Sequence, residues 1–461
     1  MNNKQQKHHP KGEQRKSGTV TSIDRIGQTN KGEVKVEFTG KNITPFGGIG
    51  LFSKFMRKLA IKGSLDKISG IAACNIGKKV VSIVHGFACG LERPSDTEVL
   101  QKDKVFQTVT GEDYPDQTTF SRFLKSCTVK GAAAIQDIGT RKLFRVRNDF
   151  RDFLKLTLDL DSHVKTVYGA QQRAKVGYNP KKPGRKSYHP LLCFIGETRD
   201  FLRGKFRAGD RYTSTGAVDL LKECLTLIPR HIMQLCLRAD SGFFSYDFLR
   251  FLESRHIKYA VVAKLYSTIQ GKLGGLHYRD IGGNVAVSEF EHCLTKGNKV
   301  LRVRMIVIRE EVKEDGQATK KQPRLLELKG YSYQVIATNI REEKPEEVWR
   351  FYNGRANVEN MIKEAAAGFG MDESPSHWYA GNMTYFYIGM LAYNLMNWFK
   401  ELVLAQAKQK MMLKRLRNRF ILIAGKLVHT GRTFILKLSQ SYPWQEEYRM
   451  AEARLEALQL V

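Results

Sequence analysis

The segment Leu154–Asp161 constrains the fold more than any other part of this chain. It reads Leu-Lys-Leu-Thr-Leu-Asp-Leu-Asp, so every second residue is a leucine and the residues between are polar. A period of two is typical of a β-strand, whose successive side chains point to opposite faces. The strand therefore carries on one face, and ends in, the polar set Lys155, Thr157, Asp159 and Asp161.

Six further elements follow this strand. Four have apolar, strand-like sequences and two have the amphipathic period of helices. The strands are predicted at 188–197, 201–207, 233–239 and 259–265, and the helices at 215–227 and 246–255. The order β-β-β-α-β-α-β predicts an α/β fold with a mixed sheet flanked by helices. Asp240 directly follows the fourth strand, as Asp161 ends the first.

Composition divides the rest of the chain. After the last of these strands come short strand-like runs and a charged loop at 309–324, which predict a β-rich insertion. A helix is predicted to open at Pro345 and to continue to Ala367. The predicted regions are a flexible basic arm (1–45), a helical region (46–150), the first part of the core (151–265), the insertion (266–330), the second part of the core (331–400) and a helical C-terminal region (401–461).

The charge balance restricts the partners. The 461 residues include 76 Lys and Arg against 46 Asp and Glu, a formal net charge of +30. A folded protein with that field attracts polyanions, so nucleic acid is the first partner to consider and an anionic membrane surface the second. The most apolar stretch, 385–399, is shorter than a bilayer span and contains Asn394 and Asn397, which predicts a buried helix.

Cysteine usage and the start of the chain bear on location. The seven cysteines include no CxxC pair, which predicts free thiols in a reducing compartment. The chain begins with a polar, basic stretch that lacks the apolar region of a secretory signal. We therefore expect a cytoplasmic protein.

Three carboxylates stand where metal-dependent phosphoryl chemistry would need them. Asp161 and Asp240 lie at strand ends, and Glu359 lies on the helix after the insertion. Mg²⁺ prefers oxygen ligands, and two such ions about 3.5–4 Å apart hold the attacking and leaving oxygens of an in-line displacement. The alternative is that the three acids form ordinary salt bridges or helix caps, because their spacing does not show that they meet.

The helix around Glu359 adds two further groups. Tyr352, Arg355 and Glu359 fall at i, i+3 and i+7, so on a continuous helix they share one face over two turns. A carboxylate, a guanidinium and an aromatic hydroxyl on one face suit a phosphate held beside a metal ion. A solvated Arg355–Glu359 pair is the alternative.

Three ordered motifs carry a family resemblance. They are Asp161-Ser162, the block Arg238-Ala-Asp-Ser-Gly-Phe243 and the spacing Tyr352-x-x-Arg355-x-x-x-Glu359. Together they resemble the DDE transposases of bacterial insertion sequences, in the group with the Tyr-Arg-Glu-Lys signature. The stretch from Val176 to Pro190, with its run Pro-Lys-Lys-Pro-Gly-Arg-Lys, is similar to the IS1380-type branch.

The resemblance implies an RNase H-like catalytic core and cut-and-paste movement of DNA bounded by inverted terminal repeats. It implies that Asp161, Asp240 and Glu359 are the catalytic metal ligands for two Mg²⁺ ions, with Mn²⁺ as an alternative. The expected partners are double-stranded DNA, as terminal repeats and target, and a second copy of the chain in a homodimer. Residues 46–150 would bind the DNA ends, and the enzyme would be associated with the bacterial nucleoid.

Two positions depart from the family pattern or leave a choice. The signature lysine is expected seven residues after Glu359, where this chain has Ala366, and Lys363 could reach a phosphate instead. Asp159 competes with Asp161 as the first metal ligand. We favour Asp161, since Ser162 follows it, and assign Asp159 to a supporting role. His163 is either a ligand or a structural residue.

Basic residues concentrate in the loop after the first strand. Its Pro and Gly residues limit its freedom, so it could lie along a phosphate backbone, although a solvated loop is the alternative. The residues are Arg173, Lys175, Lys181, Lys182, Arg185 and Lys186. The run 414–419 is open to the same two interpretations, and Trp378 and Tyr379 either stack an unpaired base or pack in the core.

Two rival functions use the same residues. A metal-dependent DNA nuclease would keep the carboxylates but cut without transposition. A catalytically inactive DNA-binding protein descended from a transposase would bind DNA without cutting it. Strand transfer separates the first rival from a transposase, and nicking separates the second.

Overall fold

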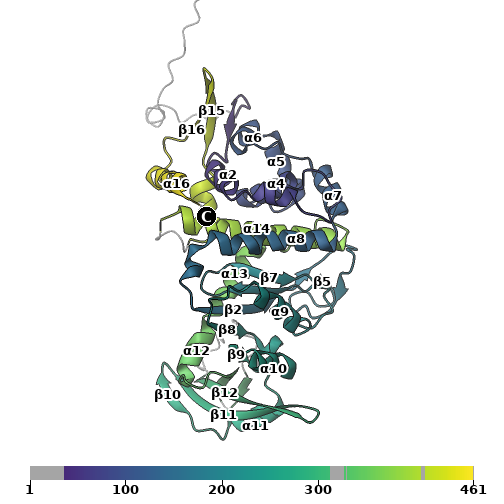
Figure 1. The fold of residues 1–461 in the computed structure, drawn as a ribbon, viewed down its shortest axis with the longest axis vertical. Coiled ribbons are helices and arrows are strands. Elements are labelled where there is room, and N and C mark those ends of the chain that lie inside the picture. The colour runs from purple at the N-terminus through teal and green to yellow at the C-terminus, as the bar shows by residue number, and fades with distance from the viewer. Residues whose placement is uncertain (1–35, 312–325, 329, 406–410, 460–461) are drawn as a thin grey trace, which may run out of the picture. The chain divides into compact units, whose positions relative to one another are not determined.

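The computed structural model describes residues 36–311, 326–328, 330–405 and 411–459. The chain divides into two compact units, residues 1–41 and 42–461, and every element below belongs to the second unit. Most of the predicted basic arm and most of the predicted charged loop at 309–324 lie outside the described residues. Figure 1 shows the arrangement of the elements.

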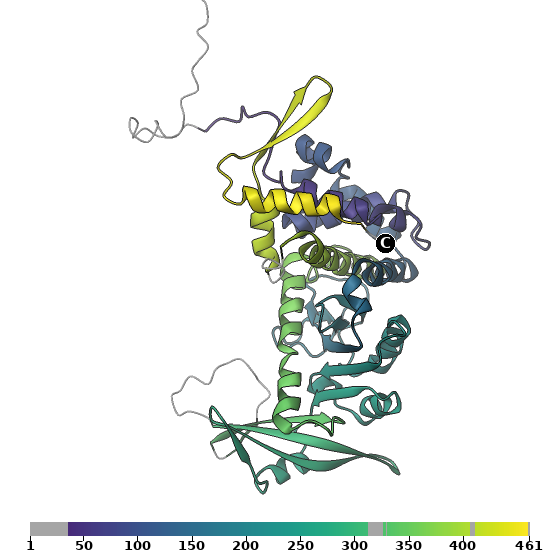
Figure 2. The same ribbon diagram turned by 60° about the vertical axis from the view of Figure 1, so that its left-hand side comes forward.

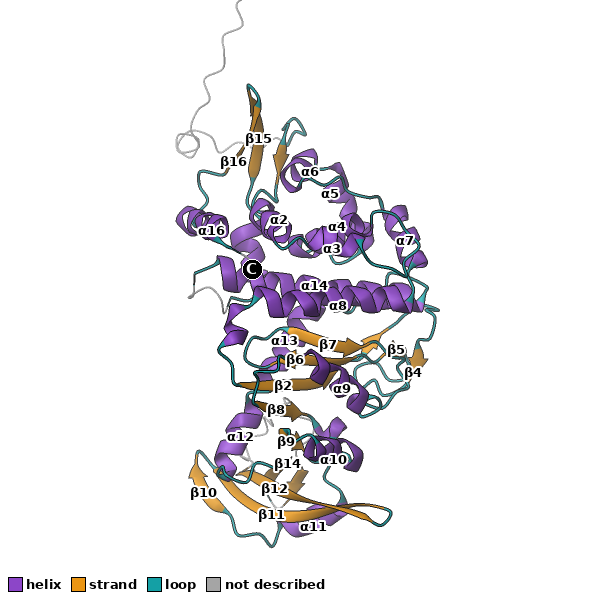
Figure 3. Cartoon of the chain, viewed as in Figure 1, coloured by secondary structure: helices purple, strands orange, loops and turns teal. Residues whose placement is uncertain are grey.

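A mixed sheet forms the core, with the strand order β10-β11-β12-β14-β9-β8-β2-β6-β7 (Figure 3). The strands of this sheet that come first along the chain are β2 (Lys155–Ser162), β6 (Leu191–Ile195), β7 (Phe201–Lys205), β8 (Gln234–Ala239) and β9 (Lys258–Val262). Strand β2 is antiparallel to β6 and parallel to β8, and β9 is parallel to β8. Helices α9 (Ala217–Leu227) and α10 (Tyr246–Ser254) lie between strands, so the predicted α/β fold with a mixed sheet flanked by helices is confirmed.

Strand β2 is buried on both faces. Leu156, Leu158 and Leu160 are fully buried in the main core, as the alternation predicts. The polar face is buried as well, since Asp159 is 0% exposed and Asp161 8% exposed. Buried carboxylates are stable only when they are paired or hydrogen-bonded, so this face must be covered by compensating charges.

Helices cover both faces of the sheet. Helix α12 (Pro345–Asn353) packs Val348 and Tyr352 against Ala260, Ile306 and Ile336. Figures 1 and 2 show α9 and α10 on the opposite side of the sheet from α12. Pro345 opens α12 as predicted, and the Glu347 carboxylate accepts a hydrogen bond from the Lys344 N–H at 3.0 Å.

The edge strand β7 is closed by a long helix, α14 (Tyr379–Val403). The Asn394 side chain accepts from the Phe201 N–H and donates to the Phe201 carbonyl, each at 2.8 Å. The run 385–399 is buried throughout, as predicted. Among the described residues, no helix combines the length and apolar character that a bilayer span requires.

The predicted strand 188–197 is wrong as a single element. It is split into β5 (Lys186–Tyr188) and β6, because Pro190 has no N–H to donate to a strand ladder. Strand β5 pairs instead with β3 (Lys165–Thr166) and β4 (Lys175–Val176) in a separate small sheet. The loop predicted at 173–186 is therefore partly ordered by strand pairing.

The insertion continues the core sheet. Strand β12 (Lys299–Glu311) pairs with β14 (Tyr331–Thr338), and β14 pairs with β9. The remaining strands are β10 (Arg279–Gly282), β11 (Val285–Lys296) and β13 (Leu326–Leu328). The insertion also contains a helix that the sequence did not predict, α11 (Ser267–Leu273), which buries only Ile269 and Leu273 and so gives a weak period.

The N-terminal region of this unit is helical, as predicted. Its helices are α2 (Ile49–Lys58), α3 (Ile61–Asp66), α4 (Ile76–Cys89), α5 (Glu98–Lys102), α6 (Lys104–Thr110), α7 (Gln117–Ser126) and α8 (Val129–Val146). Asp116 caps α7, accepting from the Thr119 N–H at 2.6 Å.

The prediction of an all-helical region at 401–461 is wrong. Strands β15 (Gly425–Thr430) and β16 (Thr433–Leu438) form a hairpin, and β15 pairs with β1 (Ile43–Thr44). Gly431 has a φ of 57° in the two-residue turn, which glycine adopts without strain. The helices of this region are α15 (Leu413–Leu416) and α16 (Gln445–Ala457), with one turn of π-helix at Arg417–Ile421.

Candidate active site

Four segments bring acidic and basic side chains to one cleft. Leu160 of β2 is paired with Ala239 of β8 in the parallel register, so Asp161 and Asp240 leave the sheet side by side. The cleft has a volume of about 510 Å³. The predicted site residues that line it are Asp161, His163, Lys181, Asp240, Tyr352, Arg355 and Glu359.

The helix that carries Glu359 is broken, which corrects the prediction of one continuous helix from Pro345 to Ala367. Helix α12 ends at Asn353, and α13 spans Ala356–Gly368, with Arg355 at its N-cap. The i, i+3, i+7 face therefore does not exist as predicted. Tyr352, Arg355 and Glu359 nevertheless reach the same cleft, and Glu359 lies in the first turn of α13.

Asp161 is the most perturbed acid of the cleft. Burial raises its pKa to about 6, and the nearby negative charges of Asp240 and Glu359 act in the same direction. The Arg355 guanidinium lowers the pKa and so opposes this effect. The Ser162 N–H donates to Asp161 Oδ1 at 2.8 Å. Negative charge is thus concentrated at this point.

Arg355 supplies the positive charge inside the cleft. Its Nη2 atom lies 2.7 Å from Asp161 Oδ2, and its Nη1 atom lies 3.9 Å from Glu359 Oε1. Burial alone would lower the pKa of Arg355, but the charges of Asp161 and its neighbours raise it above its ordinary value. Arg355 is therefore a permanent cation. Burial also raises the pKa of the Tyr352 hydroxyl, which stays protonated.

The oxygen atoms of the three cleft carboxylates are suitable ligands for a divalent cation. Within the described ranges, no three His, Cys, Asp or Glu side chains are gathered closely enough to hold a metal ion as they stand. The three cleft carboxylates are all oxygen donors. Burial raises the pKa of Asp161, the charges of Asp240 and Glu359 raise it further, and a bound cation would lower it. Arg355 occupies the space between Asp161 and Glu359.

Asp159 and His163 are placed differently from the three cleft acids. Asp159 lies beneath the cleft and accepts two hydrogen bonds from Arg238, at 2.6 and 2.7 Å. His163 lines the cleft, and its Nε2 atom lies 2.5 Å from Asp372 Oδ1. Next to it, the buried Lys165 ammonium donates to the Glu373 carbonyl. His163 and Lys165 thus hold the β2–β3 connection against the segment that follows α13.

Apart from the buried Arg355, the basic residues predicted to contact DNA are exposed. Lys363 is 72% exposed, and its Nζ atom lies 3.9 Å from Glu359 Oε2. The six basic residues of 173–186 are all exposed, and only Lys181 among them lines the cleft. Arg173 stacks on Tyr379 at 4.9 Å, and Arg185 lies 5.8 Å from the Tyr168 ring.

Not all of the run 414–419 is exposed. Arg417 is buried, and its Nη2 atom donates to the Phe87 carbonyl at 2.8 Å. Arg419 lies 4.5 Å from the Trp444 ring and 3.3 Å from Glu447 Oε2. Lys414 and Arg415 are exposed.

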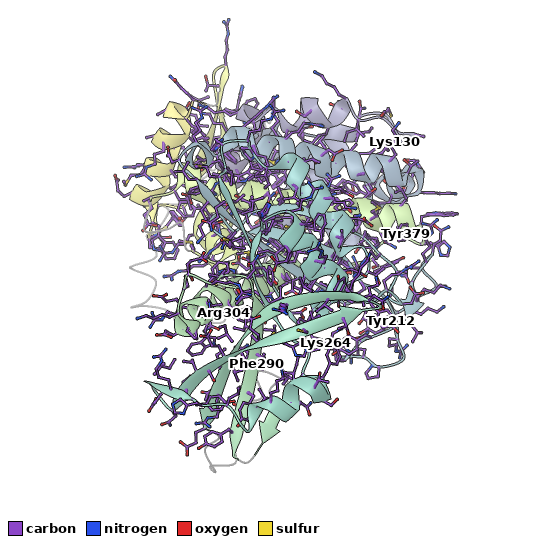
Figure 4. All side chains as sticks on the ribbon, turned by 60° about the horizontal axis from the view of Figure 1, so that its bottom comes forward. Lys130, Tyr212, Lys264, Phe290, Arg304 and Tyr379 are labelled. Carbon is purple, nitrogen blue, oxygen red and sulfur yellow. The ribbon has the colours of Figure 1, made fainter. Side chains whose placement is uncertain are left out.

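Several residues that line the cleft were not predicted as site residues. Asn179, His189 and Thr213 line it, and Ser162 Oγ lies 3.4 Å from Thr213 Oγ1. An adjoining cavity of about 720 Å³ is lined by Tyr212 and Lys264, which are labelled in Figure 4. These residues come from loops with no periodic pattern. Some residues at or near the cleft stand in motifs that carried the family resemblance: Arg238 in the block that ends at Phe243, Ser162 next to Asp161, and Asn179 and His189 in the stretch from Val176 to Pro190.

Comparison with known proteins places the chain in a family. None of the curated proteins matches it. Among solved structures it is similar to the piggyBac transposase in a synaptic complex with hairpin DNA, with a TM-score of 0.44, 12% identity, and coverage of 80% of this chain and 78% of that chain. Residues 27–460 match the family model described as Transposase DDE domain group 1. The chain therefore belongs to the family of transposase DDE domains.

Proposed function

We propose that this chain is a DNA transposase that cleaves and joins phosphodiesters at the inverted terminal repeats of an insertion sequence, by a cut-and-paste route. One observation carries the proposal. Asp161, Asp240 and Glu359, from two strands and a helix far apart in sequence, line one cleft together with Arg355 and Tyr352. A family member that lacked chemistry would have no need to keep three acids around a buried arginine.

Asp161, Asp240 and Glu359 would hold two Mg²⁺ ions, for which Mn²⁺ can stand in. Bound there, the ions supply a means to activate an attacking oxygen and to stabilise a leaving one. The protein's own groups prepare the site for them. Asp161 gives up its proton at neutral pH, since its pKa is about 6, and the Ser162 and Gly242 amides orient the Asp161 and Asp240 carboxylates.

The remaining residues would hold the DNA. Arg355 offers a fixed cation for a phosphate, and Tyr352 offers a hydroxyl donor on the same wall of the cleft. Lys363 and the exposed residues Arg173, Lys175, Lys181, Lys182, Arg185 and Lys186 would contact the backbone on either side. Residues 46–150 would recognise the terminal repeats.

Finer assignments follow the same proposal. The strand order β7-β6-β2-β8-β9, with β2, β8 and β9 parallel, supports an RNase H-like core. The stretch from Val176 to Pro190 supports the IS1380-type branch of bacterial elements. We further propose a homodimer that pairs two DNA ends in the nucleoid, because two ends must be cut and joined together.

The test uses the DNA that flanks the gene. A fragment ending in the flanking inverted repeat is incubated with the protein and Mg²⁺ or Mn²⁺, and nicking and joining to a target plasmid are followed. We expect both products with the wild-type chain, and about 10³-fold less with Asp240→Asn or Glu359→Gln, because each removes a metal ligand. Equal cleavage by Asp240→Asn would refute the mechanism.

The same assay separates the rivals. Nicking without joining identifies a nuclease. Binding of the repeat without metal and without nicking identifies an inactive DNA-binding protein.

A further inference from the structure

One buried guanidinium connects three of the segments that build the cleft. Arg238 of β8 is paired with Asp159 of β2, its Nε and Nη2 atoms donating to the two carboxylate oxygens at 2.6 and 2.7 Å. Its Nη1 atom donates to the Phe351 carbonyl at 3.0 Å, and its guanidinium lies 5.3 Å from the Phe351 ring. Phe351 belongs to α12.

Each of these contact points is next to a residue of the proposed catalytic site. Asp159 stands two residues before Asp161, and Arg238 stands two residues before Asp240. Phe351 precedes Tyr352, and the chain then turns through Gly354 into Arg355 and Glu359. A shift of the guanidinium would therefore reach all three proposed ligand segments through short stretches of chain, two residues to Asp161 or Asp240 and eight residues to Glu359.

The pair is built to stay in place. Asp159 is 0% exposed and Arg238 8% exposed, and a buried bidentate pair has fixed geometry. Removing one partner of such a pair leaves an uncompensated buried charge, which strongly destabilises the protein. Net stability alone is a weak reason for a chain to bury an ion pair, which leaves alignment of the segments as its role.

Two glycines make room for the Arg238 side chain. A Cβ atom at Gly354 would overlap Nη1 of Arg238, and one at Gly196 would lie 2.7 Å from its Nη2 atom. Gly354 has a φ of −56° and a ψ of −19°, an ordinary helical conformation that any residue adopts. The backbone therefore does not require glycine at position 354. What requires it there is the approach of Arg238.

We propose that Arg238 is a positioning residue that sets the geometry of Asp161, Asp240 and the Arg355–Glu359 segment relative to one another. It bonds to Asp159 and to the end of α12 instead of touching substrate. The helix break between α12 and α13 is the hinge that it holds. This inference rests on the proposed function for its catalytic consequence, but the contacts themselves can be tested without catalysis.

The first experiment uses Gly354→Ala and measures amide hydrogen exchange in the free protein. An alanine normally stabilises a helical position relative to glycine, so replacing a glycine that merely lies near a helix end would slow exchange there. We expect the opposite, faster exchange over 351–359, because the added methyl group displaces Arg238. Gly271→Ala in α11 is the control, since no atom lies within 4 Å of its added Cβ.

The second experiment compares Arg238→Met with Arg304→Met. Arg304, labelled in Figure 4, is also 8% exposed, and its Nε atom lies 2.6 Å from Glu289 Oε2 while Nη1 donates to the Glu343 carbonyl at 2.9 Å. It lies in β12 of the insertion. Each variant removes a buried guanidinium. Because Glu289 is half exposed whereas Asp159 is fully buried, Arg238→Met should lower the free energy of unfolding more than Arg304→Met does.

We expect only Arg238→Met to change the site. Loss of a residue that orients metal ligands lowers metal affinity or activity by about 10–100-fold. Mn²⁺ affinity and kcat for nicking should fall by that factor in Arg238→Met, with the KM for the DNA end changed less than about twofold. Arg238→Lys should recover part of the loss, since it restores one charge but not the bidentate geometry.

The outcomes distinguish this inference from the proposed function. If wild-type nicking needs metal and the three acids, but Arg238→Met behaves as Arg304→Met does, the positioning role is wrong and the function stands. If no DNA is cut at all, the exchange result still decides the inference. Slower or unchanged exchange at 351–359 in Gly354→Ala would overturn it.

Discussion

Arg355 offsets part of the negative charge of the acids in the cleft. Arg355 lies 2.7 Å from Asp161 and is almost fully buried, so the two groups form a pair shielded from solvent. Because Glu359 is within 3.9 Å of the same guanidinium, the arginine offsets negative charge on both sides. Arg355 thus offsets part of the negative charge of the three cleft acids in the folded protein.

Arg355→Gln is expected to lower the free energy of unfolding by about 3 kcal/mol, because it leaves the buried Asp161 carboxylate without a counter-charge. In the Asp161→Asn background, the same change should cost little more. Urea unfolding of the two single variants and the double variant measures this coupling. Lys363→Gln is the control, since that exposed pair with Glu359 is worth less than about 0.5 kcal/mol. Strictly additive losses would contradict the prediction.

His85 gives a stability that depends on pH. It lies on α4, is 1% exposed, and among the described residues neither of its ring nitrogens has a hydrogen-bond partner. Burial lowers its pKa to about 3, and the charge of Arg57 acts in the same direction. The unfolded chain takes up a proton at this side chain near the ordinary histidine pKa of 6.5, whereas the folded protein does not.

The free energy of unfolding should therefore fall as the pH drops from 6.5 toward 3, with His85 contributing up to about 1.4 kcal/mol per pH unit. His85→Leu keeps the volume of the site, loses no hydrogen bond, and removes this contribution. Denaturant unfolding of both proteins between pH 4.5 and 7.5 tests it. The difference between them should grow steadily below pH 6.5, and a constant difference would show that His85 does not titrate on unfolding.

Among the elements, those with a strong local period were predictable. Strand β2 follows from its alternating leucines, α7 from the Asp116 cap, and α12 from Pro345. The break after Asn353 was not predictable, because Gly354 keeps helical angles and the Arg238 side chain that donates to the Phe351 carbonyl comes from a strand far away in sequence. The β15–β16 hairpin was hidden because its strands are short and largely exposed, so their alternation does not mark a buried face.

The candidate site was likewise predictable only where a local sequence pattern exists. The chemistry of Asp161, Asp240 and Glu359 could be proposed from residue types and motifs. Their common cleft depends on the parallel register of β2 and β8, which pairs residues about eighty positions apart. The ion pair of Arg355 with Asp161, and that of Arg238 with Asp159, are tertiary contacts with no local pattern.

The Asn394 amide is one of the groups by which helix α14 stabilises the sheet edge. Asn394→Leu should destabilise the protein by about 2–4 kcal/mol, because it leaves both the N–H and the carbonyl of Phe201 buried without a partner. Thermal and urea unfolding measure the effect. Asn360→Leu, at an exposed position of α13, should change stability by less than about 0.5 kcal/mol. Equal losses in the two variants would mean that the Asn394 bonds contribute nothing beyond a polar surface group.

At the scale of the whole molecule, the net charge of +30 predicts salt-sensitive DNA binding. Replacing Lys181, Lys182 and Arg185 together by Gln should reduce the slope of log affinity against log salt by about 2–3, since each phosphate contact contributes about 0.9. Fluorescence anisotropy with a labelled duplex at several KCl concentrations gives the slope.

The control for that measurement replaces Lys222, Arg250 and Arg255, three exposed basic residues on and beside α9 and α10. Replacing these three residues by Gln changes the net charge by the same amount, but away from the cleft. A slope that falls equally in both triple variants would show that charge alone, and not contact by the 173–186 loop, governs binding.

The bonds between Asn394 and Phe201 also set an order of events during synthesis. The two residues are 193 positions apart, so at about 5–20 residues per second β7 leaves the ribosome roughly 10–40 s before its partner on α14 is made. During that interval the strand edge has free backbone groups that can pair with another nascent chain. A ribosome that stops before α14 would release a chain prone to aggregate, so translation must run nearly to the end before the sheet edge is protected.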